Sequence, residues 1–181
     1  GVISLGVYME AIVHLNGKDF DTTSYAQQIQ MAECHFYFIQ GAQAAHNELY
    51  LPAVVSFLNG IESTIRVIIN NQNSPHVYTE PSAYKCLSNN LLLNAREIGL
   101  DVTKLAFDGE NNFVARLESQ KPNFEMVEVV RVRNNLCHGN VFEFVNQEYM
   151  IFTPECIRAL CYQLFDISVR WSSEIERFRN A

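Results

Sequence analysis

Apolar residues recur every three to four positions along most of the chain, which is the spacing of one face of an α-helix. This spacing predicts long helices over residues 25–48, 53–70, 83–98 and 123–138, a last helix from Pro154 almost to the C-terminus, and a short helix near 113–117. Helices joined by few residues must double back on one another. We therefore expect a mainly α fold, an antiparallel bundle of four to five helices.

Two short runs depart from the helical spacing. Residues 1–20 contain β-favouring apolar residues, among them Val7 and Tyr8, followed by Asn16-Gly17, a dipeptide typical of tight hairpin turns. A second run, over 141–152, alternates between apolar and polar residues on either side of Asn146-Gln147. Both runs predict small β-hairpins that decorate the bundle. At the N-terminus the pattern does not decide between a strand and a helix.

The composition is that of a folded, acidic protein. Of 181 residues, 48% are hydrophobic and 18% are charged, which suits one well-packed domain over residues 1–181. The net charge is −7, and the Lys and Arg residues form no block of like charge. This balance excludes a non-specific nucleic-acid binder, so any contact with RNA must be local.

Cysteines and apolar runs indicate a cytoplasmic location. The five cysteines form no Cys-x-x-Cys pair and lie largely within helical patterns, as reduced thiols do. The longest apolar runs are shorter than the roughly 18 residues that a membrane span requires, so we expect no membrane partner. Histidines and cysteines show no ligand spacing, and no Gly-rich phosphate loop is present. We therefore expect neither a metal nor a cofactor.

Residues 133–138, Arg-Asn-Asn-Leu-Cys-His, carry the main chemical signal of the chain. An Arg, a polar residue directly after it and a His after four intervening residues resemble the signature of HEPN-superfamily ribonucleases, which lies on a late helix of a small bundle. The resemblance implies metal-independent cleavage of RNA, in which the ribose 2′-hydroxyl attacks the adjacent phosphate and leaves a cyclic phosphate and a 5′-hydroxyl. It also implies a homodimer, with the motifs of two protomers lining one cleft.

Each residue type in the motif suits a step of that reaction. A histidine such as His138 changes charge near neutral pH and transfers a proton to or from the reacting oxygens. The guanidinium of Arg133 matches a phosphate and stabilises its developing charge, while the amide of Asn134 orients the histidine or the phosphate. Asn135 and the two further arginines, Arg131 and Arg66, are candidates for support and for substrate capture.

A helical projection separates Arg133 from His138. Residues five apart diverge by about 140° on a helix, and Arg133 falls within the apolar face while His138 and Asn134 share the polar one. Either the helix end unwinds near Gly139 or Arg133 is turned inward. Glu62 lies within the apolar stripe of another predicted helix. Because an unpaired buried charge is costly, we expect Glu62 to pair with Arg133.

Two interpretations therefore stay open. In the first, the chain is a HEPN-like endoribonuclease of the toxin or defence-effector type, with RNA as substrate and an antitoxin or other protein as a further partner. In the second, it is a non-catalytic helical module that binds RNA, a nucleotide or a protein partner. Under the second, Arg133 forms an inter-helix ion pair and His138 is a helix-terminal residue favoured by the helix dipole.

Overall fold

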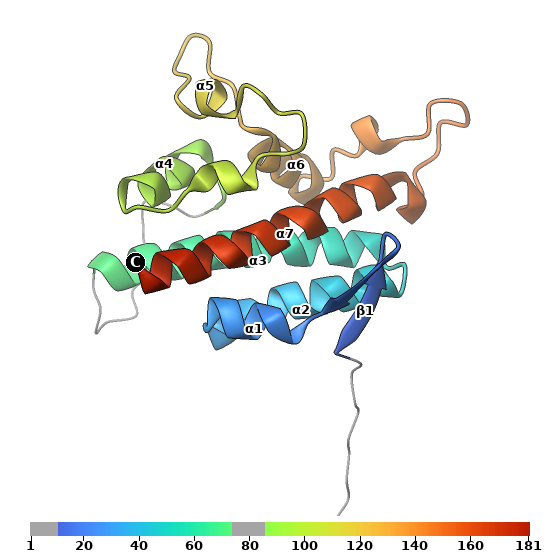
Figure 1. Ribbon diagram of the computed structural model, residues 1–181. Coiled ribbons are helices and arrows are strands. Elements are labelled where there is room, and N and C mark those ends of the chain that lie inside the picture. The colour runs from blue at the N-terminus through green and yellow to red at the C-terminus, as the bar shows by residue number, and fades with distance from the viewer. Residues whose placement is uncertain (1–10, 74–85) are drawn as a thin grey trace, which may run out of the picture.

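In the computed structural model, which describes residues 11–73 and 86–181, an N-terminal hairpin precedes the helices (Figure 1). Strands β1 (Ile12–Leu15) and β2 (Lys18–Asp21) pair antiparallel, with Leu15 opposite Lys18. Asn16 and Gly17 form the turn with φ of 51° and 77°, the left-handed values that such a turn requires. The predicted hairpin is thus confirmed over residues 12–21, and the part of the prediction that concerns Val7 and Tyr8 falls outside the described residues.

The single helix predicted over 25–48 is wrong, because two helices occupy this stretch: α1 (Thr23–Ile29) and α2 (Ala32–His46). Gln30 ends α1 in a left-handed conformation, with φ of 52°, and Met31 is extended. The carbonyl of Met31 accepts the backbone N–H groups of Cys34 and His35 and so starts the next helix. The break lets α1 pack against α7, while α2 packs mainly against α3.

Helices α3 (Tyr50–Asn73) and α7 (Arg158–Asn180) run side by side through the middle of the molecule (Figure 1). The indole Nε1 of Trp171, on α7, donates to the Thr64 hydroxyl on α3 at 2.9 Å in the core. Glycine permits the close approach of α2 to α3, since a Cβ at Gly60 would lie 2.7 Å from the ring of Phe38. Helices α1 and α2 cover one side of the α3–α7 layer.

The other side of this layer carries α4 (Asn89–Glu97), the 3₁₀ turn η1 (Val102–Leu105), α5 (Phe113–Leu117) and α6 (Glu128–Cys137). The short helix at 113–117 is confirmed, whereas α4 begins only at Asn89, after the N-cap Ser88. Helix α6 begins five residues later than predicted. The side chain of Asn89 bonds the carbonyl of Glu125 and the N–H of Val127, which holds this segment outside the helix.

The hairpin predicted over 141–152 is also wrong. A 3₁₀ turn, η2 (Phe142–Phe144), follows α6, and a single bridge joins Asn146 to Ile151. The Asn146 side chain accepts the N–H groups of Glu148 and Tyr149, so this stretch closes as a turn and leaves too few residues for a ladder. A further turn, η3 (Pro154–Ile157), then leads into α7.

The fold is mainly α, as expected, with one small hairpin in the described residues. One helix of the described chain, α3, is long and apolar enough over Tyr50–Gln72 to cross a membrane by length and composition. However, 56% of its most apolar stretch is buried inside the fold. Burial of this extent is typical of a helix in the core of a folded domain.

Candidate functional site

Arg133 lies on α6 and points toward α3. Its side chain is 19% exposed, and its Nε lies 3.4 Å from Oε2 of Glu62, whose side chain is 14% exposed. The predicted pairing of Glu62 with Arg133 is therefore confirmed. The pair connects α6 with α3, two helices that are in contact.

The Glu62 carboxylate contacts two further groups besides Arg133. Its Oε2 also accepts the N–H of Leu87 at 2.8 Å, and its Oε1 lies 3.6 Å from the guanidinium of Arg66, one turn further along α3. The buried Nε of Arg133 makes no hydrogen bond to any residue that the structure describes, and its contact with Glu62 is an ion pair. The carboxylate thus holds Arg133 in place without saturating its donors.

His138 forms the end of α6 and is exposed to solvent. Its backbone N–H still donates to the carbonyl of Asn134 at 3.0 Å, so the helix is regular up to this residue. Gly139 then ends the helix with φ of 70°, the left-handed stop that its position predicts. Of the two arrangements left open by the helical projection, the structure has the second, with a regular helix end and Arg133 turned inward.

This geometry keeps Arg133 and His138 of one chain on different sides of α6. Asn134 and Asn135 lie between them, both half-buried. The Asn134 amide donates to the sulfur of Met126, whereas the Asn135 amide donates to Glu143. The structure therefore brings Glu62, Arg66 and Arg133 together in one cluster and leaves His138 outside it.

Arg131 belongs to a different cluster, on the face of α6 turned away from α3. Its guanidinium donates to both carboxylate oxygens of Glu128 and, through Nη1, to Glu143 at 2.6 Å. The hydrogen bond from Arg131, opposed by burial, holds the pKa of Glu128 below its usual value, and the same contact raises the pKa of Arg131. Arg131 is thus occupied by two carboxylates of its own chain.

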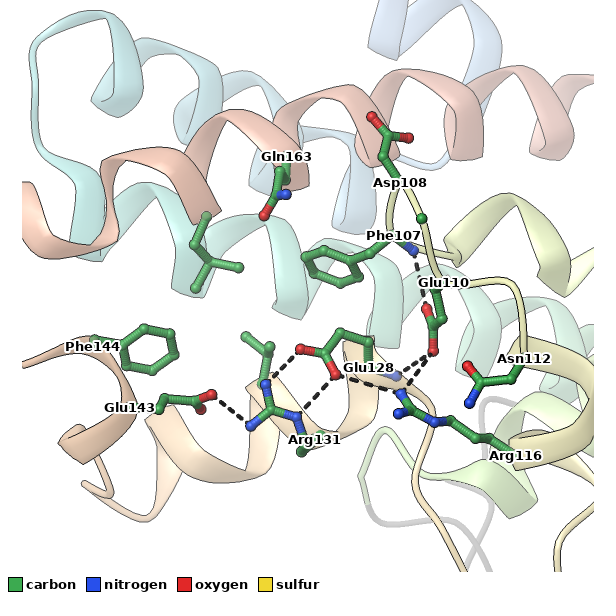
Figure 2. A pocket seen from close by; sticks show the side chains of 13 residues that line it. Phe107, Asp108, Glu110, Asn112, Arg116, Glu128, Arg131, Glu143, Phe144 and Gln163 are labelled. Atoms are coloured by element: carbon green, nitrogen blue, oxygen red, sulfur yellow. Dashed lines mark hydrogen bonds and ion pairs between the residues drawn. The ribbon is translucent and has the colours of Figure 1, made fainter.

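The cluster extends along one wall of a cavity of about 430 Å³ between α6, the segment before α5 and α7 (Figure 2). Arg116 lies within 3.7 Å of Glu128 and 3.6 Å of Glu110. The Glu110 carboxylate, 4% exposed, accepts the N–H groups of Phe107 and Glu128. The sequence did not predict this cavity, because its charged residues come from four separate elements (the loop before α5, α5, α6 and η2) with no common spacing.

No group of three or more His, Cys, Asp or Glu residues within 11–73 and 86–181 is arranged to hold a metal ion. The cysteines in this part of the chain are all free, and Cys34 and Cys161 are buried. Burial raises the pKa of the Cys34 thiol to about 11 and that of Cys161 to about 12, which makes both unreactive at neutral pH. The chemistry available at the motif is therefore that of an exposed histidine, the exposed free thiol of Cys137, two amides and Arg133.

Comparison with models of known protein families, with curated proteins and with solved structures found no match to this chain.

Proposed function

We propose that this protein is a HEPN-like, metal-independent endoribonuclease whose active site forms between two copies of the chain. The observation that carries the proposal is the motif at 133–138 on a regular helix end, where His138 is exposed and Arg133 keeps unused donors beside Glu62. In this assignment His138 transfers protons and Arg133 stabilises the phosphate, with Asn134 orienting one of them.

The homodimer is part of the proposal for a chemical reason. Transfer of a phosphate from one oxygen to another benefits from a base at the nucleophile and an acid at the leaving group, and each chain supplies one His138. A two-fold axis beside the end of α6 would bring two such histidines to one cleft.

Cleavage of RNA in EDTA tests the enzymatic role. We expect wild type to yield fragments ending in a 2′,3′-cyclic phosphate, detected by mass spectrometry, and His138→Ala to lower the rate by about 10²–10⁴-fold. Arg133→Ala should lower it as well, with circular dichroism to verify folding. His14→Gln, at an exposed histidine on the hairpin, is the matched control and should cleave as wild type does. Equal cleavage by wild type and His138→Ala would refute the proposal.

Mixing subunits tests the shared cleft. After exchange between wild type and His138→Ala chains, activity should fall with the square of the wild-type fraction if one cleft needs both histidines. A linear fall would mean that each chain acts alone. Light scattering that reports a monomer at the assay concentration would contradict the dimer directly.

A specific observation also favours the second interpretation, a non-catalytic module. Arg133 is half-buried and ion-paired, as an arginine with a purely structural role would be. In that case the exposed His138 and its neighbouring amides belong to a binding surface for RNA, a nucleotide or a protein partner. RNA binding by wild type that His138→Ala weakens, with no cleavage by either protein, would support this interpretation.

A further inference from the structure

The cavity beside Arg131 has the size of a small-molecule site, and its lining is more polar than apolar. Its volume of about 430 Å³ falls within the range of roughly 300–1,000 Å³ that such sites occupy. Phe107, Val132 and Leu160 give it an apolar side and are nearly or fully buried, and the half-buried Phe144 stands at one end. Figure 2 shows Gln163 reaching toward it from α7, across from the charged wall.

The charged wall has more acceptors than donors. Asp108, Glu110, Glu128 and Glu143 line the cavity, against the two guanidinium groups of Arg116 and Arg131. Arg131 is bound by two of these carboxylates, and Arg116 lies within 3.7 Å of two. A carboxylate offers about four lone-pair sites. Each of these four carboxylate groups accepts only one or two hydrogen bonds from described residues, so each keeps acceptor capacity for a ligand.

Charged side chains just outside the cavity do not cancel its excess of negative charge. Arg170 approaches Asp108 with 3.5 Å between Nη1 and Oδ1, while Glu125 lies 3.5 Å from Nε of Arg116. These two outer groups carry opposite charges and offset each other. The cavity therefore retains two more negative than positive charges, and it disfavours phosphates and other anions.

We propose that this cavity binds a guanidinium cation. A planar guanidinium donates two parallel hydrogen bonds to a carboxylate and stacks on aromatic faces, which the wall and the rings of Phe107 and Phe144 provide. Asp108, whose side chain is 79% exposed, lies at the rim where such a cation enters. The site is separate from the motif at 133–138, and the proposal does not depend on ribonuclease activity.

A guanidinium reaches this cavity from one of two sources, a free small cation or an arginine side chain of a partner protein. Agmatine is the probe for the first source, and a short glycine peptide with one central arginine is the probe for the second. N-acetyl-arginine amide and its neutral counterpart, N-acetyl-citrulline amide, test the charge itself. Calorimetry gives the affinities, and amide chemical shifts at Asp108, Gly109 and Gln163 locate the site.

We expect saturable binding of N-acetyl-arginine amide that weakens with salt, no binding of the citrulline amide, and shift changes confined to the cavity. Agmatine binding without the peptide identifies a free cation, and peptide binding identifies a partner's arginine. Glu143→Gln should weaken binding about tenfold, and the more exposed Asp108→Asn should weaken it less. Glu97→Gln, at an exposed glutamate on α4, should have no effect.

Three results would overturn the proposal. The first is equal affinity for the arginine and citrulline amides. The second is binding of the arginine amide that neither Glu143→Gln nor Asp108→Asn weakens. The third is binding of guanosine monophosphate in this cavity by a protein that does not bind the arginine amide. None of these results bears on RNA cleavage, so the failure of this proposal is distinct from the failure of the ribonuclease proposal.

Discussion

Arg131 and Arg133 lie two residues apart on α6 and have opposite surroundings. Arg131 is 36% exposed and donates to Glu128 and Glu143 through three of its nitrogens. Arg133 is 19% exposed and pairs with Glu62 alone among the described residues, with no hydrogen bond from its buried Nε. Arg131, the more exposed of the two arginines, therefore makes more hydrogen bonds than Arg133.

This difference separates a structural cation from a candidate functional one. The carboxylates around Arg131 fix it as part of the wall that ties α6 to the segment after it. Arg133 is held by an ion pair that leaves donors for a further partner, at a position where desolvation strengthens any charge interaction. Under the proposed ribonuclease function, phosphate contact is therefore a role for Arg133 and not for Arg131, although substrate capture by Arg131 was also expected from the sequence.

Removing Glu62 should give the largest effect on stability. Glu62→Ala leaves Arg133 unpaired between two helices and takes the acceptor from the N–H of Leu87. We expect a loss of about 2–4 kcal/mol in the free energy of unfolding, measured by urea denaturation. Glu118→Ala is the control, since its pair with Arg96 is exposed and should contribute under about 1 kcal/mol. Equal losses in the two variants would contradict the assignment of Glu62.

The Glu62–Arg133 pair was predictable from the sequence because each charge interrupts an apolar stripe of helical spacing. The helices themselves were predictable for the same reason. The break between α1 and α2 was not, because Gln30 adopts its left-handed conformation without a glycine or proline to mark it. The start of α6 was not predictable either, since Asn89 sets it from 36 residues away along the chain.

Truncation of Arg131 should have a smaller effect. Arg131→Ala removes hydrogen bonds to Glu128 and Glu143, but its exposure lets water replace part of them, so we expect a loss of roughly 1 kcal/mol in the free energy of unfolding. If Arg131 has no catalytic duty, RNA cleavage should stay within a few-fold of wild type. A loss of activity as large as that of Arg133→Ala would reverse the assignment of the two arginines.

The charged wall that contains Arg131 could not be predicted from the sequence. Glu110, Arg116 and Glu143 come from a loop, the short helix α5 and the turn η2, and each is an ordinary surface residue by its own neighbourhood. Only tertiary packing brings them to one cavity. The expected hairpin over 141–152 would have given Glu143 a different position, so the error in local structure concealed this contact.

The smallest expected effect concerns acid stability. The hydrogen bond from Arg131 lowers the pKa of Glu128 in the folded protein below the ordinary value of 4.5, so the stabilisation is complete above pH 4.5 and is lost as the pH falls through the folded pKa. Glu128→Gln should therefore reduce the difference in unfolding free energy between neutral pH and pH 3 by under about 1 kcal/mol. Glu118→Gln is the control at an exposed pair. An unchanged pH profile in Glu128→Gln would show that Arg131 is held by Glu143 alone, and its surroundings would then resemble those of Arg133.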